Sequence, residues 1–312
     1  MPGAPANLSR TVLRLGTRGS PLARWQAEWV ADRLQALGRQ VEIVCIETGG
    51  DRSSRPIPAL GGQGLFTKEI QRALLDRRVD LAVHSLKDLP TEPVHGLVLA
   101  AVPPRDSPGD ALVSPIASSL EALPQGARVG TGSRRRQSQL LHARPDLRVA
   151  ELRGNVDTRL RKLDEGQYDA IVLAEAGLKR LGRAHRIAQI IPPEIMLPAA
   201  GQGALGIETR ADDLRAREAL LPLDDRATRQ AVLAERAVLA ELRGGCLAPI
   251  GMWARMEQGR LVLDAAVLSP AGDRRVAARA QGSPEDPQSL GAEVARQLLA
   301  QGAAQLIAEA RA

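Results

Sequence analysis

Residues 12–21, Val-Leu-Arg-Leu-Gly-Thr-Arg-Gly-Ser-Pro, set the pattern for the first two-thirds of the chain. A short apolar strand runs into a loop of glycine, threonine and serine, and a helix begins directly after it. Ser20 is a favourable N-cap, and Pro21 suits the first helical position because that position needs no backbone N–H donor. The stretch therefore predicts a strand, a tight loop and a helix in direct succession.

The same succession recurs further along the chain. Apolar strands are predicted over 41–46, 80–84 and 169–173, Thr67 precedes a helix over about 68–77, and 128–133 leads into a helix over 134–141. Strands that alternate with helices indicate an α/β fold with a largely parallel sheet.

Two proline-rich passages, 101–108 and 191–198, divide this region. They predict crossovers into and out of a second lobe, with a strand over 204–209 that rejoins the first lobe. The predicted domains are a discontinuous α/β lobe over 10–103 plus 204–221 and a second, arginine-rich α/β lobe over 109–197.

The pattern changes after residue 225. A helix over 227–243, strands over 252–256, 261–268 and 274–280, and a final helix over 287–310 predict a small α+β domain over 226–312. Tight turns at 258–259 and 270–273 would join the strands as antiparallel neighbours.

Composition excludes several classes of protein. The chain has 312 residues, 44% of them hydrophobic and 25% charged, as in soluble globular proteins of two or three domains. No apolar run approaches the roughly 18–20 residues that span a bilayer, and Met1–Asn7 lacks the pattern of a signal peptide. The expected location is the cytoplasm.

Charge is concentrated in one segment. The net charge of the chain is +6, and residues 128–162 contain ten basic and three acidic residues, a net charge of +7. Arginine dominates, and its planar fork suits carboxylates and phosphates, so the expected partner is an anion. Positive charge is the single feature that favours a nucleic-acid partner. The chain has five aromatic residues, which leave little for base stacking, and no zinc-finger or basic-zipper spacing occurs.

The two cysteines have contrasting settings. Cys45 lies in the apolar strand predicted over 41–46 and is expected to be buried as a small hydrophobe. Cys246 follows two glycines and precedes Pro249, on a turn that could present its sulfur. A loop cysteine is more often incidental than functional, so this observation alone decides nothing.

Polar residues at strand ends are candidate ligands. Arg135, Arg136 and Arg153 lie close to predicted helix N-termini, which favour anions, although a solvated helix face would look the same. Lys87 and Asp88 follow an apolar strand, where open α/β sheets bind ligands, or they form a local ion pair.

Seven ordered motifs over about residues 10–310 resemble one family, porphobilinogen deaminase. They are Arg14-Leu-Gly-Thr-Arg-Gly-Ser-Pro-Leu-Ala, Gly64-Leu-Phe-Thr-Lys-Glu, Ala82-Val-His-Ser-Leu-Lys-Asp-Leu-Pro, Gly130-Thr-Gly-Ser-Arg-Arg-Arg-Gln, Leu152-Arg-Gly-Asn-Val-Asp-Thr-Arg-Leu, Leu197-Pro-Ala-Ala-Gly-Gln-Gly and Gly244-Gly-Cys-Leu-Ala-Pro-Ile-Gly.

The resemblance implies three domains, the first two like a two-lobed periplasmic binding protein. It implies a dipyrromethane cofactor joined by a thioether to Cys246. Members of the family join four porphobilinogen molecules head to tail into hydroxymethylbilane and release ammonia. Each porphobilinogen bears an acetate and a propionate, which matches the expected anion. A monomer without metal, nucleotide or nucleic acid is implied.

The resemblance also assigns residues. Asp88 matches the catalytic carboxylate, which stabilises positive charge on the substrate pyrrole and contacts the cofactor. The implied cofactor ligands are Lys87, Thr131, Ser133, Arg135 and Arg136, and the implied substrate ligands are Arg18, Ser20, Phe66, Arg153, Arg159, Arg180 and Gln202. Gln63 and Ala59 replace loop lysines that are common in the family. The rival hypothesis, a non-catalytic two-lobed anion-binding protein, does not account for Cys246.

Overall fold

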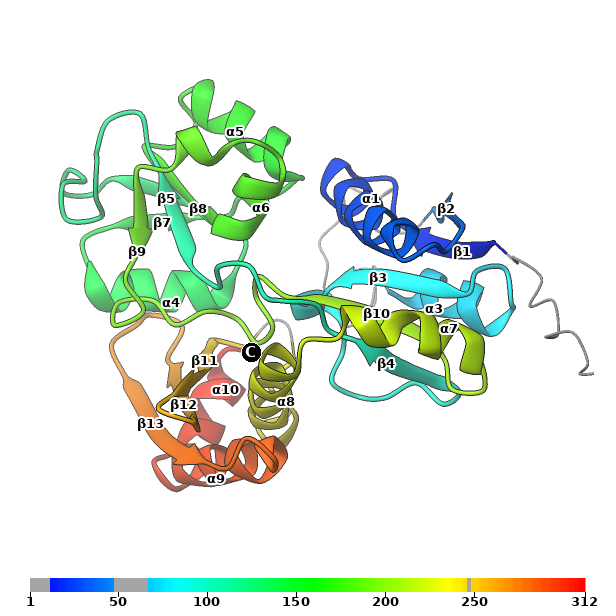
Figure 1. Ribbon diagram of the computed structural model, residues 1–312. Coiled ribbons are helices and arrows are strands. Elements are labelled where there is room, and N and C mark those ends of the chain that lie inside the picture. Colours follow the sequence, from blue (N-terminus) through cyan, green and yellow to red (C-terminus); the bar gives the residue numbers. More distant parts are fainter. Residues whose placement is uncertain (1–11, 48–66, 246–247, 312) are drawn as a thin grey trace, which may run out of the picture. The chain divides into compact units, whose positions relative to one another are not determined.

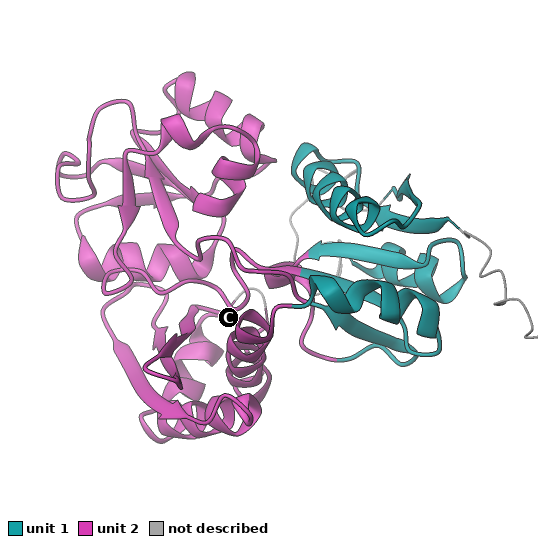
Figure 2. Ribbon diagram, viewed as in Figure 1, with its two compact units in different colours: residues 1–84, 93–101, 206–224 teal, residues 85–92, 102–205, 225–312 magenta. Residues whose placement is uncertain are grey.

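The computed structural model describes residues 12–47, 67–245 and 248–311. The chain forms two compact units, which Figure 2 colours separately. The first unit comprises 1–84, 93–101 and 206–224, and the second comprises 85–92, 102–205 and 225–312. Within the described ranges, no helix is long and apolar enough to cross a membrane.

The first unit is built on a five-stranded sheet in the order β2-β1-β3-β10-β4 (Figure 1). Strand β1 is parallel to β2 and β3, whereas β10 is antiparallel to β4. The elements are β1 (Leu13–Thr17), α1 (Pro21–Ala36), β2 (Val41–Cys45), α3 (Lys68–Leu75), β3 (Leu81–Ser85), β4 (Leu97–Ala101), β10 (Leu205–Arg210), α7 (Leu214–Leu220) and the 3₁₀ turn η4 (Leu221–Leu223).

The predicted start of α1 is confirmed. Ser20 caps the helix by accepting a hydrogen bond from the Ala23 backbone N–H at 3.4 Å, and Pro21 is the first helical residue. The core between α3 and the sheet contains Ile70, Leu74 and Val79, all at most 1% exposed.

The prediction that Cys45 is buried is wrong. Strand β2 is at the edge of its sheet, and Glu42, Ile43 and Cys45 are exposed. An apolar run indicates a buried strand only when both faces of the sheet are covered at that strand.

The second unit contains a five-stranded sheet in the order β7-β6-β8-β5-β9. Its elements are β5 (Asp110–Val113), β6 (Arg128–Gly130), α4 (Arg134–Ala143), β7 (Arg148–Ala150), α5 (Val156–Asp164), β8 (Ala170–Ala174), α6 (Glu175–Arg180), the 3₁₀ turn η3 (Ala184–Arg186) and β9 (Gln189–Ile191). Strand β6 is parallel to β7 and β8, but β5 is antiparallel to β8 and β9. The expectation of largely parallel sheets is therefore wrong for β5, as it is for the β10–β4 pair.

The remaining part of the second unit is the α+β region that the sequence predicts. Its antiparallel sheet has the order β11-β12-β13, and one face packs against helices through Met252, Leu263 and Val294. The elements are α8 (Arg226–Glu241), β11 (Ile250–Glu257), β12 (Arg260–Leu268), β13 (Arg275–Gly282), α9 (Pro287–Ala300) and α10 (Ala303–Glu309). The single final helix predicted over 287–310 is wrong, because Gly302 adopts a φ of 94° and separates α9 from α10.

Both predicted crossovers are confirmed. The chain leaves the first sheet after β4 and enters the second at β5, and it returns from β9 to β10. Strand β10 then lies between β3 and β4, as the rejoining strand should. The three domain boundaries drawn from the sequence remain predictions, since the chain divides into two compact units.

Candidate functional site

Most of the candidate residues lie at one edge of the sheet in the second unit, where its parallel strands have their carboxyl ends. The parallel strands β6, β7 and β8 end there, so the loops that lead into α4, α5 and α6 meet at this edge. Strand β5 runs the other way, and its first residue, Asp110, pairs with the last residues of β8 and β9. A carboxylate at the beginning of one strand is thereby placed beside the ends of the others.

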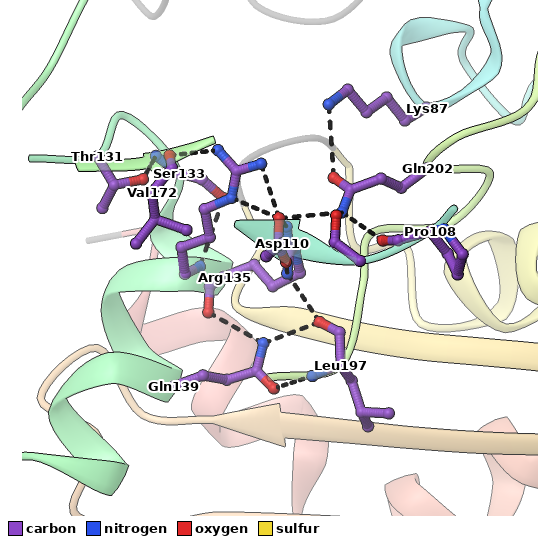
Figure 3. Close-up of polar contacts among 12 residues, drawn as sticks. Lys87, Pro108, Asp110, Thr131, Ser133, Arg135, Gln139, Val172, Leu197 and Gln202 are labelled. Carbon is purple, nitrogen blue, oxygen red and sulfur yellow. Dashed lines mark hydrogen bonds and ion pairs between the residues drawn. The ribbon is translucent and has the colours of Figure 1, made fainter. Parts of the chain in front are cut away.

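Asp110 binds Arg135 and Arg136, two of the three arginines in the first turn of α4 (Figure 3). Its Oδ2 accepts from Arg135 Nη1 at 2.6 Å, and its Oδ1 accepts from Arg136 Nε at 2.9 Å. Arg135 also donates to the Leu197 carbonyl at 2.7 Å, and Arg136 to the Val172 carbonyl at 3.0 Å. The solvated-face interpretation is therefore wrong for these arginines, whose side chains are 5% and 6% exposed.

Gln202 extends this network from a sharply turned loop. The glycines on both sides, Gly201 and Gly203, have φ values of 69° and 84°, a region that favours glycine. A Cβ on Gly203 would lie 2.4 Å from the Asp106 carbonyl oxygen, so no other residue fits. Gln202 Nε2 donates to Asp110 Oδ1 at 2.9 Å and to the Pro108 carbonyl at 2.7 Å.

Lys87 and Asp88 lie on the 3₁₀ turn η2 (Leu86–Asp88), directly after β3. Lys87 is half-buried and donates from Nζ to Gln202 Oε1 at 3.4 Å, whereas the Asp88 carboxylate is exposed. These two described residues form no ion pair with each other, so the local-pair interpretation is wrong.

The cluster consists of Lys87, Asp110, Arg135, Arg136 and Gln202, which these hydrogen bonds join. The other three arginines predicted in the second unit differ in their contacts. Arg159, on α5, is half-buried and donates to the Gly154 carbonyl at 2.7 Å. Arg180 donates to the Gly203 carbonyl at 2.6 Å and lies 3.7 Å from Asp106. Arg153 forms an ion pair with the exposed Glu151.

The cluster has more positive than negative charge. Burial opposes ionisation of Asp110, but Arg135 and Arg136 outweigh it and hold the pKa of this carboxyl well below its usual range. Burial and the charge of Arg136 lower the pKa of Lys87 to about 8 and that of Arg159 to about 10. Burial also lowers the pKa of Arg136. Carboxylates of a bound ligand would offset both the burial and the repulsion between these cations, so the site suits a ligand with several carboxylates.

The structure brings together most of the predicted site residues. Those at this edge are Lys87, Asp88, Thr131, Ser133, Arg135, Arg136, Arg159, Arg180 and Gln202. Ser133 caps α4 by accepting from the Arg136 N–H at 3.4 Å, and Thr131 Oγ1 accepts from the Ser133 N–H at 3.2 Å. Arg18 and Ser20 are in the first unit, between β1 and α1. Phe66 and Cys246, and the departures Ala59 and Gln63, are outside the described residues.

Sequence reasoning missed Asp110. Its signal is an acidic residue that opens an otherwise apolar strand, Asp-Ala-Leu-Val, in which every residue is buried. An acid in such a strand needs a buried cationic partner, and the run Arg134–Arg136 supplies one.

Among the described residues, no group of three histidine, cysteine or acidic side chains is placed to hold a metal ion. Independently of that, the lysine and arginine side chains at the site suit organic anions.

Comparison with known proteins agrees with this chemistry. Residues 13–218 match the family model described as porphobilinogen deaminase, dipyromethane cofactor binding domain. Residues 229–300 match the model of the porphobilinogen deaminase C-terminal domain.

Solved structures give a weaker likeness. A putative methionine-binding lipoprotein from Bacillus subtilis is 13% identical, with 68% of this chain and 89% of that chain covered and a TM-score of 0.44. A periplasmic substrate-binding protein of an ABC transporter from Coxiella burnetii is 17% identical, with 70% and 94% covered and a TM-score of 0.44. Similarity at this level says nothing about function. The two family models span nearly the whole chain, which therefore belongs to the porphobilinogen deaminase family and synthesises hydroxymethylbilane from porphobilinogen.

Proposed function

We propose that the chain carries its dipyrromethane cofactor on Cys246 and uses Asp88 as the catalytic carboxylate of this transferase reaction. The Gly244-Gly-Cys-Leu-Ala-Pro motif supports the first assignment, and the motif around Lys87-Asp88 supports the second. The single observation that carries the proposal is the positively charged cluster at the end of the sheet, with Asp88 at its exposed side.

The described residues fit a dipyrromethane. Each of its rings bears an acetate and a propionate, so the group brings several carboxylates into one site. Burial lowers the pKa values of Lys87, Arg136 and Arg159, and neighbouring guanidinium groups lower them further; nearby carboxylates would reverse this effect. Thr131 and Ser133, at the N-terminus of α4, add hydroxyls and backbone N–H groups that favour anions.

The cationic residues have a binding and orienting role. Guanidinium groups bind carboxylates with two parallel hydrogen bonds, which fix the direction of the ligand as well as its position. When bound, the dipyrromethane supplies the pyrrole carbon to which the first substrate is joined. Lys87 and Arg136 would hold its acetate and propionate groups in a fixed position, and Arg159 would bind the carboxylates of each substrate that enters.

Asp88 has a different role, because it is an acid among cations. A carboxylate here repels the acidic groups of the substrate, so binding alone does not explain it. Loss of ammonia from porphobilinogen leaves positive charge on the pyrrole, and a fixed carboxylate beside the pyrrole N–H stabilises that charge. The same carboxylate can move the proton that the departing ammonia gains or that the attacked ring loses.

The decisive experiment is the intact mass of the purified protein. The proposal predicts an excess equal to two pyrrole units, absent in Cys246→Ser and retained in the matched control Cys45→Ser. Cys246→Ser should lose nearly all turnover and keep its fold, as circular dichroism can check. A wild-type mass without any adduct would favour the non-catalytic anion-binding protein, and an adduct that persists in Cys246→Ser would disprove the attachment site.

Other assignments remain predictions from the sequence. The protein is predicted to be monomeric and cytoplasmic and to bind no nucleic acid. Its predicted domains span 10–103 plus 204–221, 109–197 and 226–312.

A further inference from the structure

Asp110 is a completely buried carboxylate in the middle of the cationic cluster, and the mechanism proposed above gives it no role. We infer that Asp110 is a positioning residue, which orients Arg136 directly and Lys87 through Gln202 so that both face the carboxylates of the ligand. The inference rests on the proposed binding of those carboxylates at Lys87 and Arg136.

The first arm of the network fixes Arg136. Asp110 Oδ1 lies 2.9 Å from Nε and 2.8 Å from Nη2 of this arginine, so two nitrogens on one edge of the guanidinium converge on a single carboxylate oxygen. Nη1 donates to the Val172 carbonyl, which prevents rotation of the plane. Arg135 binds the other side of Asp110 and the Leu197 carbonyl, so it anchors the carboxylate to the chain.

The second arm fixes Lys87. Three acceptors face Gln202 Nε2: Asp110 Oδ1 at 2.9 Å, the Pro108 carbonyl at 2.7 Å and the Gly109 carbonyl at 3.3 Å. A flipped amide would turn Oε1 toward these oxygens, so the amide has one favourable orientation. Oε1 is then the end that accepts from Lys87 Nζ.

A simpler explanation is that Asp110 only balances charge, and the two explanations predict opposite signs. Asp110→Asn makes the site more positive by one unit. If Asp110 only balances charge, carboxylate ligands should then bind more tightly. If it positions Arg136 and Lys87, they should bind more weakly despite the added charge.

The first test is loading of protein prepared without its adduct, followed by intact mass over a range of porphobilinogen concentrations. Asp110→Asn should raise the concentration that gives half the maximal loading rate about tenfold, the scale of one charge-assisted hydrogen bond. The matched control is Asp146→Asn, which removes an arginine-paired acid of the same unit, the partner of Arg144 at 2.7 Å, and adds the same charge. A lower or unchanged half-loading concentration in Asp110→Asn would overturn the inference.

The second test does not depend on activity or on folding of the Asp110 variant. The chain has four lysines, Lys68, Lys87, Lys162 and Lys179, so ¹³C-labelled lysine side chains give few NMR signals to assign. Gln202→Met keeps both ion pairs of Asp110 but removes the acceptor of the Lys87 ammonium, so the pKa of Lys87 should fall. An unchanged Lys87 titration would overturn the inference. The change in the pKa of Lys87 can be measured whether or not the protein carries an adduct. A missing adduct would therefore reject the proposed function, while the titration of Lys87 would still decide the inference.

Discussion

Two buried aspartates, Asp80 and Asp110, each form ion pairs with arginines at the beginning of a strand, but their surroundings differ. In the first unit, Asp80 accepts from Arg14 Nη2 at 2.9 Å and from Arg210 Nη2 at 3.1 Å, and Asp213 also binds Arg210. These contacts outweigh burial and lower the pKa of Asp80, while hydrogen bonding to Asp80 raises that of Arg14. In the second unit, the pKa values of Arg136, Lys87 and Arg159 are lowered instead.

The two sets of cations differ in burial and in neighbours. Arg14 is part-exposed and its hydrogen bonds to Asp80 raise its pKa, so the folded protein already supplies the anion that it needs. Burial is the largest cause of the lowered pKa values of Arg136, Lys87 and Arg159, and neighbouring guanidinium groups add to it. Carboxylates of a ligand would offset both causes. We infer that the Asp80 network holds the first sheet together, whereas the cluster around Asp110 is prepared for a polyanionic ligand.

The largest expected effect concerns the stability of the first network. Asp80→Asn removes the carboxylate that Arg14 and Arg210 share, although Arg210 keeps its ion pair with Asp213. The substitution should lower the free energy of unfolding by about 3–5 kcal/mol, as when a buried ion pair loses one partner. Urea unfolding measures this loss. Turnover per folded molecule should stay at the wild-type level, and a specific loss of turnover would show that the Asp80 network is not purely structural.

Asp88→Asn should slow the chemical step on the order of 100-fold or more, because it keeps shape and hydrogen bonding but removes the charge that stabilises the pyrrole cation. Asp88→Glu should keep some activity, since the charge remains. Single-turnover kinetics on cofactor-loaded protein, with ammonia release as the signal, measure the step. Normal turnover in Asp88→Asn, or failure only because substrate no longer binds, would contradict the assigned role.

Arg159→Leu should weaken binding of carboxylate ligands by roughly 1.5–3 kcal/mol, about one to two orders of magnitude in affinity. The control is Arg161→Leu on the same helix, whose side chain is 62% exposed and paired with Glu165. The KM for porphobilinogen compares the two variants. Equal effects would mean that general positive charge, rather than the cluster, binds the ligand.

The smallest effect is expected at Cys45. Because its side chain is exposed on the edge strand β2, Cys45→Ser should change the free energy of unfolding by no more than about 0.5 kcal/mol. Thermal unfolding gives the value. A loss of several kcal/mol would restore the expectation of a buried thiol that the sequence suggested.

Local signals explain what could be predicted from the sequence. The caps at Ser20 and Ser133 and the crossovers near 101–108 and 191–198 depend on neighbouring residues, and the structure confirms them. Motif resemblance located Lys87, Asp88 and the arginines of α4.

Long-range pairing explains what could not be predicted. Asp110 belongs to the site because β5 is antiparallel to β8, and Cys45 is exposed because the described residues do not cover its face of the sheet at the edge strand β2. Neither relation can be read from the residues next to them.

The central claim, that the cluster in the second unit lacks anions until its ligand is bound, is tested most directly at Lys87. Titration of its ¹³C-labelled side chain should give a pKa of about 8 in Cys246→Ser, which cannot be loaded at that position. In the loaded wild type, the ligand carboxylates favour the ammonium form, so the pKa should rise toward the ordinary lysine value of about 10.4. A pKa near 10.4 in both proteins, or one that does not rise on loading, would contradict the account.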